Sequence, residues 1–237
     1  MNSFRLSLVT LGIATFALLL LFASGLGYQQ ESWTLQVAFK LVRWAAYIGI
    51  ATSLLALAGA LLARPVGKTT LLFCVALLVA AGTAFLPWRW KQIAGSVPPI
   101  HDITTDTQDP PPFVEILPLR ANAKNSAEYG GDSVAALQRK GYPDLAPATF
   151  PQPVGEMFSR ARAAVGTMGW ELVAADSASG RLEATATTQW FGFKDDVVVR
   201  VRPEGTGSRV DVRSVSRVGG SDVGTNAARI RAFLARL

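Results

Sequence analysis

Cysteine and histidine are almost absent from this chain, which has one residue of each type among 237. The single cysteine, Cys74, excludes a disulfide within the chain and a thiolate metal cluster. The single histidine, His101, excludes zinc sites that use two or three histidines and leaves few candidates for a histidine-based catalytic triad. We therefore expect no metal ion and no cofactor.

The familiar nucleotide-binding and catalytic motifs are missing as well. The sequence contains no G-x-x-x-x-G-K-[ST] phosphate loop, no Rossmann glycine fingerprint after a strand, no G-x-S-x-G and no H-E-x-x-H. Asp102, Asp106 and Asp109 stand close together but lack the alternating acids, central glycine and closing glutamate of a calcium loop. These absences leave no visible nucleophile and favour a non-enzymatic role.

Long apolar runs are abundant instead. Half of the residues are hydrophobic and the mean hydropathy is +0.28, which is too apolar for an ordinary soluble protein. Three runs, at about 6–27, 44–63 and 69–87, reach the roughly 20 helical residues that cross a hydrocarbon core. They predict a membrane domain of residues 1–92 with three transmembrane helices. The first run is longer than a signal-peptide core, so its cleavage is the less favoured alternative.

The positive charge of the chain is concentrated in this membrane domain. The net charge is +6, and the chain up to residue 92 holds seven lysines and arginines against one acid, which leaves sixteen of each sign for the rest. We therefore expect the lipid bilayer, and no nucleic acid, as a partner. Basic residues flank both sides of the helices almost equally. A cytoplasmic turn between Arg64 and Lys68 would send the C-terminal domain outside.

The segment at 93–112 is rich in proline and acids. Prolines lack a backbone N–H group and favour extended conformations in the residues before them. This stretch is therefore expected to be a stiff linker or an edge segment laid on the following domain.

Residues 113–237 have the pattern of a soluble α+β domain. Apolar residues at helical spacing follow Pro153 and recur at the C-terminus, where Ser221 or Asp222 is a plausible N-cap. Four stretches between these helices alternate like antiparallel strands. The expected elements are a strand at 113–119, helices at 133–140 and 154–168, strands at 170–176, 181–187, 196–202 and 209–216, and a helix at 223–237.

Alternation along the last three strands separates two faces of the expected sheet. One face is apolar and suits the helices: Leu182, Ala184, Ala186, Val197, Val199, Val201, Val210 and Val212. The other carries charged and polar residues, expected as a solvated ladder of ion pairs: Arg181, Glu183, Thr185, Thr187, Asp196, Arg200, Arg202, Asp211 and Arg213. The predicted fold class is α+β, with three transmembrane helices followed by a two-layer α/β sandwich whose antiparallel sheet is helix-grip-like.

Several blocks of the soluble domain occur in an order typical of one known family. They are Pro98-Pro99-Ile100-His101-Asp102-Ile103-Thr104-Thr105, Tyr142-Pro143-Asp144-Leu145, Gly169-Trp170-Glu171, Trp190-Phe191-Gly192-Phe193-Lys194-Asp195-Asp196, Arg213-Ser214-Val215-Ser216-Arg217, Ser221-Asp222 and Asn226. In these blocks residues 97–237 resemble the domain-of-unknown-function family 1499. The resemblance implies a bacterial or plastid envelope context and no assigned activity. Together with the topology, it leads us to expect a multi-pass protein of the bacterial inner (plasma) membrane with a periplasmic C-terminal domain.

The charged face of the sheet and the start of the last helix suggest a binding surface. Its arginines would hold a carboxylate or phosphate in bidentate contacts, and reversal of charge at Arg213 or Arg217 would abolish function with little change in melting temperature. The candidate residues are Arg181, Asp195, Asp196, Arg200, Arg213, Ser214, Ser216, Arg217, Ser221, Asp222 and Asn226. The expected role is a non-enzymatic envelope protein that binds a protein partner, a lipid headgroup or a small anion.

A membrane-tethered hydrolase or transferase is the alternative. It would use Asp196, His101 and the nearby serines, and it requires His101 within hydrogen-bond reach of Ser214, Ser216 or Asp196. Adjacent residues of a strand point to opposite faces, so Asp195 and Asp196 cannot act as a pair on one bond.

An aromatic cluster of Trp190, Phe191 and Phe193 lies beside Gly192 in an expected turn. It would pack in the core or, if exposed, would contact lipid headgroups or a partner protein.

Overall fold

The computed structural model of the protein describes residues 2–237 and divides into two compact units. The first unit comprises the chain up to Ile93 together with Gln189–Gly192. The second comprises Ala94–Thr188 and Phe193–Leu237. The four residues Gln189–Gly192 therefore belong to the first unit, although the chain on both sides of them belongs to the second.

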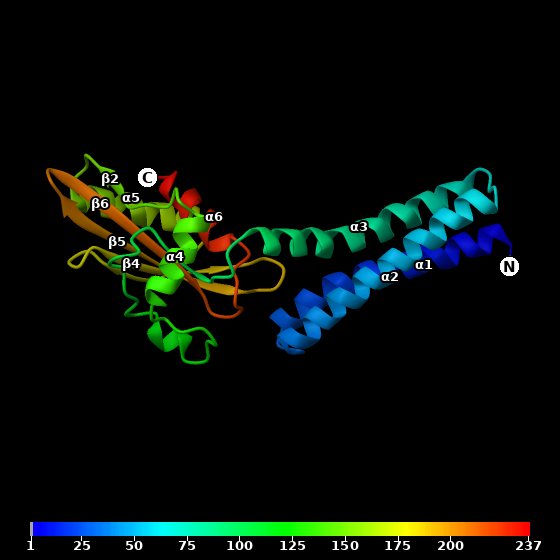
Figure 1. Cartoon of the computed structure of the whole chain (residues 1–237), viewed down its shortest axis with the longest axis horizontal. Coiled ribbons are helices and arrows are strands. Elements are labelled where there is room, and N and C mark those ends of the chain that lie inside the picture. The colour runs from blue at the N-terminus through cyan, green and yellow to red at the C-terminus, as the bar shows by residue number, and fades with distance from the viewer. Residues whose placement is uncertain (1) are drawn as a thin grey trace. The chain divides into compact units, whose positions relative to one another are not determined.

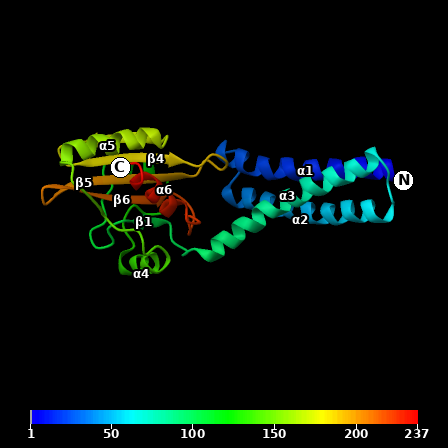
Figure 2. The same cartoon turned by 90° about the horizontal axis from the view of Figure 1, so that it is seen from above.

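Three long helices form most of the first unit, and their first two lie side by side (Figure 2). They are α1 (Ser3–Gln29), α2 (Leu35–Leu62) and α3 (Lys68–Ser96), each long and apolar enough to span a membrane. Small residues line the contact of α2 with α3, where a Cβ atom on Gly49 would lie 2.8 Å from the carbonyl oxygen of Ala80. The three predicted helices are confirmed, and each extends beyond its apolar run.

An open antiparallel sheet is the centre of the second unit (Figure 1). Its strands are β1 (Asp102–Thr104), β2 (Ala148–Phe150), β3 (Glu171–Asp176), β4 (Arg181–Thr187), β5 (Lys194–Glu204) and β6 (Gly207–Ser216). The order is β1-β6-β5-β4-β3, and β2 also pairs with β6. The α+β class with an antiparallel sheet is therefore confirmed.

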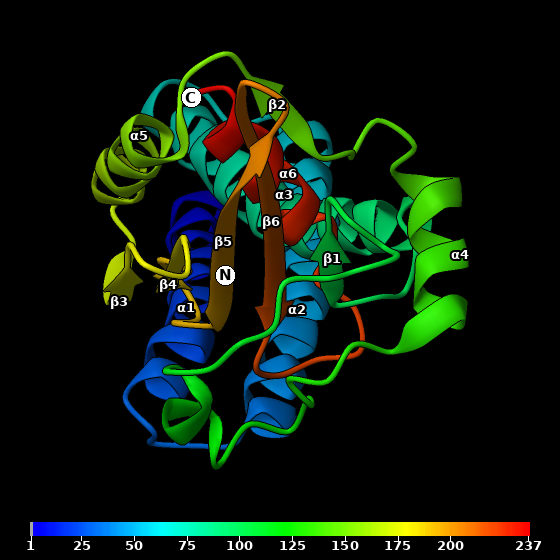
Figure 3. The same ribbon diagram turned by 90° about the vertical axis from the view of Figure 1, so that its left-hand side faces the viewer.

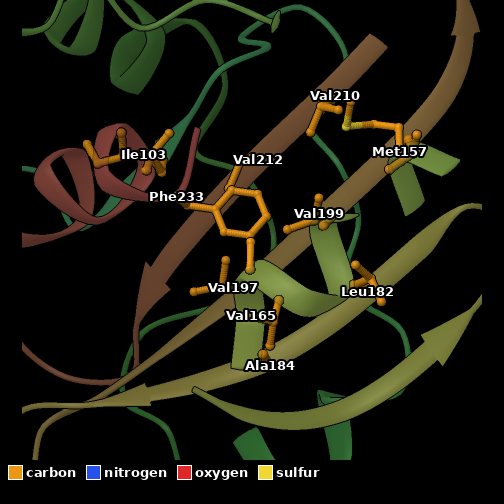
Figure 4. Packing of buried hydrophobic residues seen from close by; sticks show 14 of the residues in the cluster. Ile103, Met157, Val165, Leu182, Ala184, Val197, Val199, Val210, Val212 and Phe233 are labelled. Carbon is orange, nitrogen blue, oxygen red and sulfur yellow. The ribbon is translucent and has the colours of Figure 1, made fainter. Parts of the chain in front are cut away.

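Two helices cover the apolar face of this sheet. They are α5 (Val154–Thr167) and α6 (Thr225–Leu234), and their apolar stripes enter one core with the alternating valines of β5 and β6. Figure 4 shows the Phe233 ring of α6 among Val197, Val199 and Val212. A third helix, α4 (Gly131–Gly141), lies beside β1 (Figure 3). The Gln138 side chain of α4 accepts a hydrogen bond from the backbone N–H of Thr104 and donates one to its carbonyl oxygen.

The prediction of a strand at 113–119 is wrong. This stretch is irregular and ends in the 3₁₀ helix η1 (Leu117–Arg120). The backbone N–H groups of Val114 and Ile116 donate to the two carboxylate oxygens of Glu183, at 2.9 and 2.8 Å, instead of to a neighbouring strand. The edge strand β1 comes instead from within the proline-rich stretch, where an edge segment was one of two expectations, and β2 was not expected.

The centre of the charged face of the sheet is buried, which corrects the expectation of a solvated ladder, whereas Arg181, Arg200 and Arg202 stay partly exposed. Glu183, Asp196 and Asp211 are fully buried, and Arg213 is 2% exposed. Residues 105–130, here named the covering segment, lie over this face and place Phe113 and Ile116 against Val198 and Val215. The sequence pattern separates the two faces correctly, but it does not reveal that an irregular segment covers the second face.

Candidate functional site

Strand β5 places two adjacent carboxylates on opposite faces of the sheet, as predicted. Asp196 points to the covered face and is fully buried. It accepts hydrogen bonds from Arg120 Nη1 at 2.5 Å, from Arg217 Nε and Nη2 at 2.8 Å each, and from the Thr185 hydroxyl at 2.8 Å. Two guanidinium groups and one hydroxyl therefore surround one carboxylate.

Asp195 points to the other face, where it meets the last helix. Arg229 of α6 donates from Nη2 to Asp195 at 2.6 Å, and from Nη1 to Ser214 Oγ at 3.1 Å and to Asn226 Oδ1. Asn226 in turn donates from Nδ2 to Ser216 Oγ and to the carbonyl oxygen of His101, at 3.0 Å each. These side chains form one buried polar cluster between β6 and α6.

The N-cap of α6 is Gly224, and not Ser221 or Asp222 as expected, but both of these side chains accept hydrogen bonds from the turn that leads into the helix. The Asp222 carboxylate accepts from the backbone N–H groups of Gly224 and Asn226 at 3.1 and 2.6 Å. Burial raises the pKa of Asp222, and these two hydrogen bonds act in the opposite direction. The hydroxyl of Ser221 accepts from the N–H of Val223. The helix begins at Thr225 because Val223 and Gly224 have φ of +54° and +81°, outside the helical region.

Arg213 of β6 is enclosed by the covering segment. Its Nε and Nη2 atoms donate to the two oxygens of Asp102 in β1, at 2.9 and 2.7 Å. It also donates to the carbonyl oxygens of Pro111 and Ala127. The guanidinium lies 5.2 Å from the ring centroid of Phe113 and 5.5 Å from that of Tyr129. Burial, followed by the charge of Asp102, raises the pKa of Tyr129 to about 12.

The remaining candidate arginines are paired in the same way. Arg181 contacts Glu183 at 3.0 Å, and Arg200 contacts the buried carboxylate of Asp211 at 3.0 Å. Asp211 also pairs with further arginines of the sheet, and Asp106 and Asp109 of the covering segment join the same network. The additional arginines are Arg202 and Arg209.

Each candidate arginine of the predicted binding surface therefore already holds a carboxylate of this chain. An incoming anion would have to displace that carboxylate, because these guanidinium groups are not free cations. Whether the candidate residues also bind a ligand stays a prediction. The burial of Arg213 in particular changes the expected effect of reversing its charge from an unaltered melting temperature to a large loss of stability.

Sequence reasoning missed three members of this arrangement: Asp102, Arg120 and Arg229. Arg229 could have been found from the sequence, since it lies three residues after Asn226 and residues at this spacing share one side of a helix. Asp102 stood out in the sequence only for its closeness to Asp106 and Asp109, which gives no sign of a partner on β6. Arg120 gave no signal, because it follows an irregular segment and its partner lies 76 residues further along the chain.

The alternative of a hydrolase or transferase required a hydrogen bond from His101. In residues 2–237 the imidazole of His101 forms no hydrogen bond, whereas its backbone carbonyl accepts two. The hydroxyls of Ser214 and Ser216 are engaged with Asn226. Within the described chain, no group of three or more acidic, cysteine or histidine side chains has an arrangement that would hold a metal ion.

A shallow pocket of about 350 Å³ opens beside Arg213. Its lining is mainly apolar and comes largely from the covering segment: Pro110, Pro112, Phe113, Leu117, Ala127, Glu128, Tyr129 and Arg213. The hydroxyl of Tyr129 is buried and has no hydrogen-bond partner in the described residues. Nearby in sequence, Val114, Leu117 and Leu119 expose 41%, 45% and 53% of their surface.

Comparison with protein families matches residues 102–237 to the family described as protein of unknown function (DUF1499). This chain belongs to the DUF1499 family. The match starts at the first residue of β1 and includes the whole sheet, so the DUF1499 domain contains both carboxylates of β5 and the cluster beneath α6. No curated protein matches the chain.

Proposed function

We propose that this chain is a membrane-anchored, non-enzymatic protein whose DUF1499 domain binds a protein partner beside the membrane. The observation that carries the proposal is a set of three exposed apolar side chains within six residues of the covering segment, Val114, Leu117 and Leu119, of which Leu117 lines the apolar pocket. Exposed apolar groups that are gathered in this way are a common feature of protein interaction sites.

Lipid headgroups and small anions are weaker candidates for the same domain. They would need free guanidinium groups, and the arginines of the sheet are neutralised by Asp102, Asp196, Asp211 and Glu183. Breaking a buried ion pair costs about 3–5 kcal/mol. An exposed contact with an incoming anion contributes only about 0–1 kcal/mol, which is too little to offset that cost. A protein partner that uses the apolar surface needs no such displacement.

A crosslinking experiment tests this surface. A photoreactive phenylalanine analogue at Leu117 in the full chain, expressed in cells, should give a discrete covalent adduct of reproducible mass with one protein. The matched control is the same analogue at Leu172, an exposed apolar residue of β3 with 38% of its surface accessible. Leu119→Asp should abolish the adduct at Leu117. The same adducts at both positions, or none at Leu117, would contradict the proposal.

We further propose that the domain lies on the outer, periplasmic side of a bacterial inner membrane. Support comes from the basic turn between α2 and α3, which carries Arg64 and Lys68 and is favoured on the cytoplasmic side. In a Cys74→Ala background, a cysteine at Ser133 should react with a membrane-impermeant maleimide in intact cells. Ser133 is exposed at the start of α4. Labelling only after lysis would place the domain in the cytoplasm.

A further inference from the structure

The tip of the hairpin between β4 and β5, Gln189–Gly192, belongs to the compact unit of the three long helices. The indole Nε1 of Trp190 donates to the carbonyl oxygen of Phe22 in α1 at 3.2 Å. Its ring lies 6.0 Å from the ring of Phe22 and 5.1 Å from that of Trp90 in α3. The next residue of the tip, Phe191, is 2% exposed. These contacts explain why the tip groups with the helices.

Glycines allow the close approach of the tip to α1. A Cβ atom on Gly25 would lie 2.9 Å from the carbonyl oxygen of Trp190 and still closer to its indole ring. Within the tip, Gly192 has φ of +64°, a conformation that favours glycine, and a Cβ atom there would lie 2.7 Å from Cγ of Gln29. A larger residue at either position would force the tip and the helix apart.

The end of α1 that the hairpin tip contacts is also surrounded by other aromatic side chains. Trp33, in the turn after α1, donates from Nε1 to the carbonyl oxygen of Ser24 at 3.0 Å. Phe191 lies 6.2 Å from Tyr28 and 5.8 Å from Phe39 by ring centroids. Residues 22–28 of α1 close the apolar run of this helix, so this level corresponds to the boundary between hydrocarbon and headgroups. Tryptophan and tyrosine are enriched at that boundary because an amphipathic ring satisfies both environments.

We propose that the hairpin tip is a membrane-interface anchor, in which Trp190 contacts lipid at the level of the headgroups beside α1 and α3 and the buried Phe191 packs against Tyr28 and Phe39. The partner is the bilayer itself, and the chemistry of recognition is that of an amphipathic aromatic belt. The tip supplies two aromatic side chains to a belt that the helices already contain in Tyr28, Trp33 and Trp90. The membrane contact of this protein therefore includes residues of its DUF1499 domain.

Fluorescence quenching in vesicles tests this anchor. The full chain, with Cys74→Ala and a single new cysteine at Gln189, is labelled with an environment-sensitive fluorophore and reconstituted into phosphatidylcholine and phosphatidylglycerol vesicles. The matched control carries the cysteine at Thr206, in the exposed turn at the far end of β5. Strand β5 has 11 residues, which separates the two turns by about 35 Å.

The anchor predicts opposite results at the two positions. The probe at Gln189 should be quenched several-fold more by nitroxides at the headgroup than the probe at Thr206, and several-fold less by iodide in the water. Trp190→Ala should remove at least half of the lipid quenching at Gln189 and leave Thr206 unchanged. Equal quenching at both positions, or lipid quenching at Gln189 that persists without Trp190, would overturn the proposal.

Discussion

The two faces of the sheet in the DUF1499 domain are buried by different means. One face is covered by α5 and α6, which pack apolar side chains such as Ile230 and Phe233 onto the valines of β5 and β6. The other is covered by the irregular covering segment, which supplies Asp106, Arg120 and backbone carbonyls to a layer of ion pairs. Alternation along a strand therefore identifies its two faces, and says nothing about which of them meets water.

The difference also has an energetic consequence. Apolar burial stabilises the fold by about 25 cal/mol per Å². A buried ion pair roughly breaks even against an apolar pair of the same shape, because desolvation offsets the attraction of the charges. Loss of one partner is nevertheless costly, since the other charge stays buried without compensation. We therefore expect the helix face to supply stability and the covered face to fix one arrangement of the covering segment.

The largest effect is expected on the covered face. Asp196→Ala leaves the guanidinium groups of Arg120 and Arg217 without their carboxylate, and should lower the free energy of unfolding by about 3–5 kcal/mol. Urea unfolding of the full chain in detergent, followed by circular dichroism, measures this change. The matched control is Asp144→Ala, which breaks an exposed pair with Arg231 and should cost about 0–1 kcal/mol. Equal costs for the two variants would mean that the covered face is solvated.

The next largest loss of unfolding free energy is expected from a substitution in the core between the sheet and the helices α5 and α6. Ile230→Ala removes a fully buried side chain from the core and should cost about 2–5 kcal/mol in the same unfolding assay. Leu137→Ala, at a 41% exposed position of α4, is the control and should change the free energy little. A small cost at Ile230 would indicate that α6 contributes little to the core.

The helix face was far easier to predict from the sequence than the covered face. Stripes of apolar residues at helical spacing gave α5 and α6, and alternation gave the apolar side of β4, β5 and β6, because these signals are local. The partners of Asp196 are not local: Arg217 lies 21 residues away and Arg120 lies 76 residues away. The covering segment has no periodic pattern because most of it forms neither a helix nor a strand. Its backbone groups bond to side chains such as Glu183 instead.

The smallest effect is expected from a tyrosine of the covering segment at alkaline pH. The pKa of Tyr129 is raised by burial from 10.0 to about 12, so the unfolded chain loses this proton first as pH rises. Its contribution to stability is complete below pH 10 and is lost as pH rises through 12. Tyr129→Phe should remove this loss, and the tyrosinate absorbance near pH 12 should decrease. If the titration curve of Tyr129→Phe matched that of the unaltered protein near pH 12, the pKa of Tyr129 would not be raised by burial.

The pair of Asp102 and Arg213 tests most directly whether the covered face is a structural layer of ion pairs. The measurement is a double-mutant cycle of unfolding free energies for Asp102→Leu, Arg213→Met and the double variant. Each single variant should lose about 3–5 kcal/mol, and the double variant should lose clearly less than either, because it buries no unpaired charge. Single variants that cost almost nothing would contradict this account, and would return Arg213 to consideration as a cation available to a ligand.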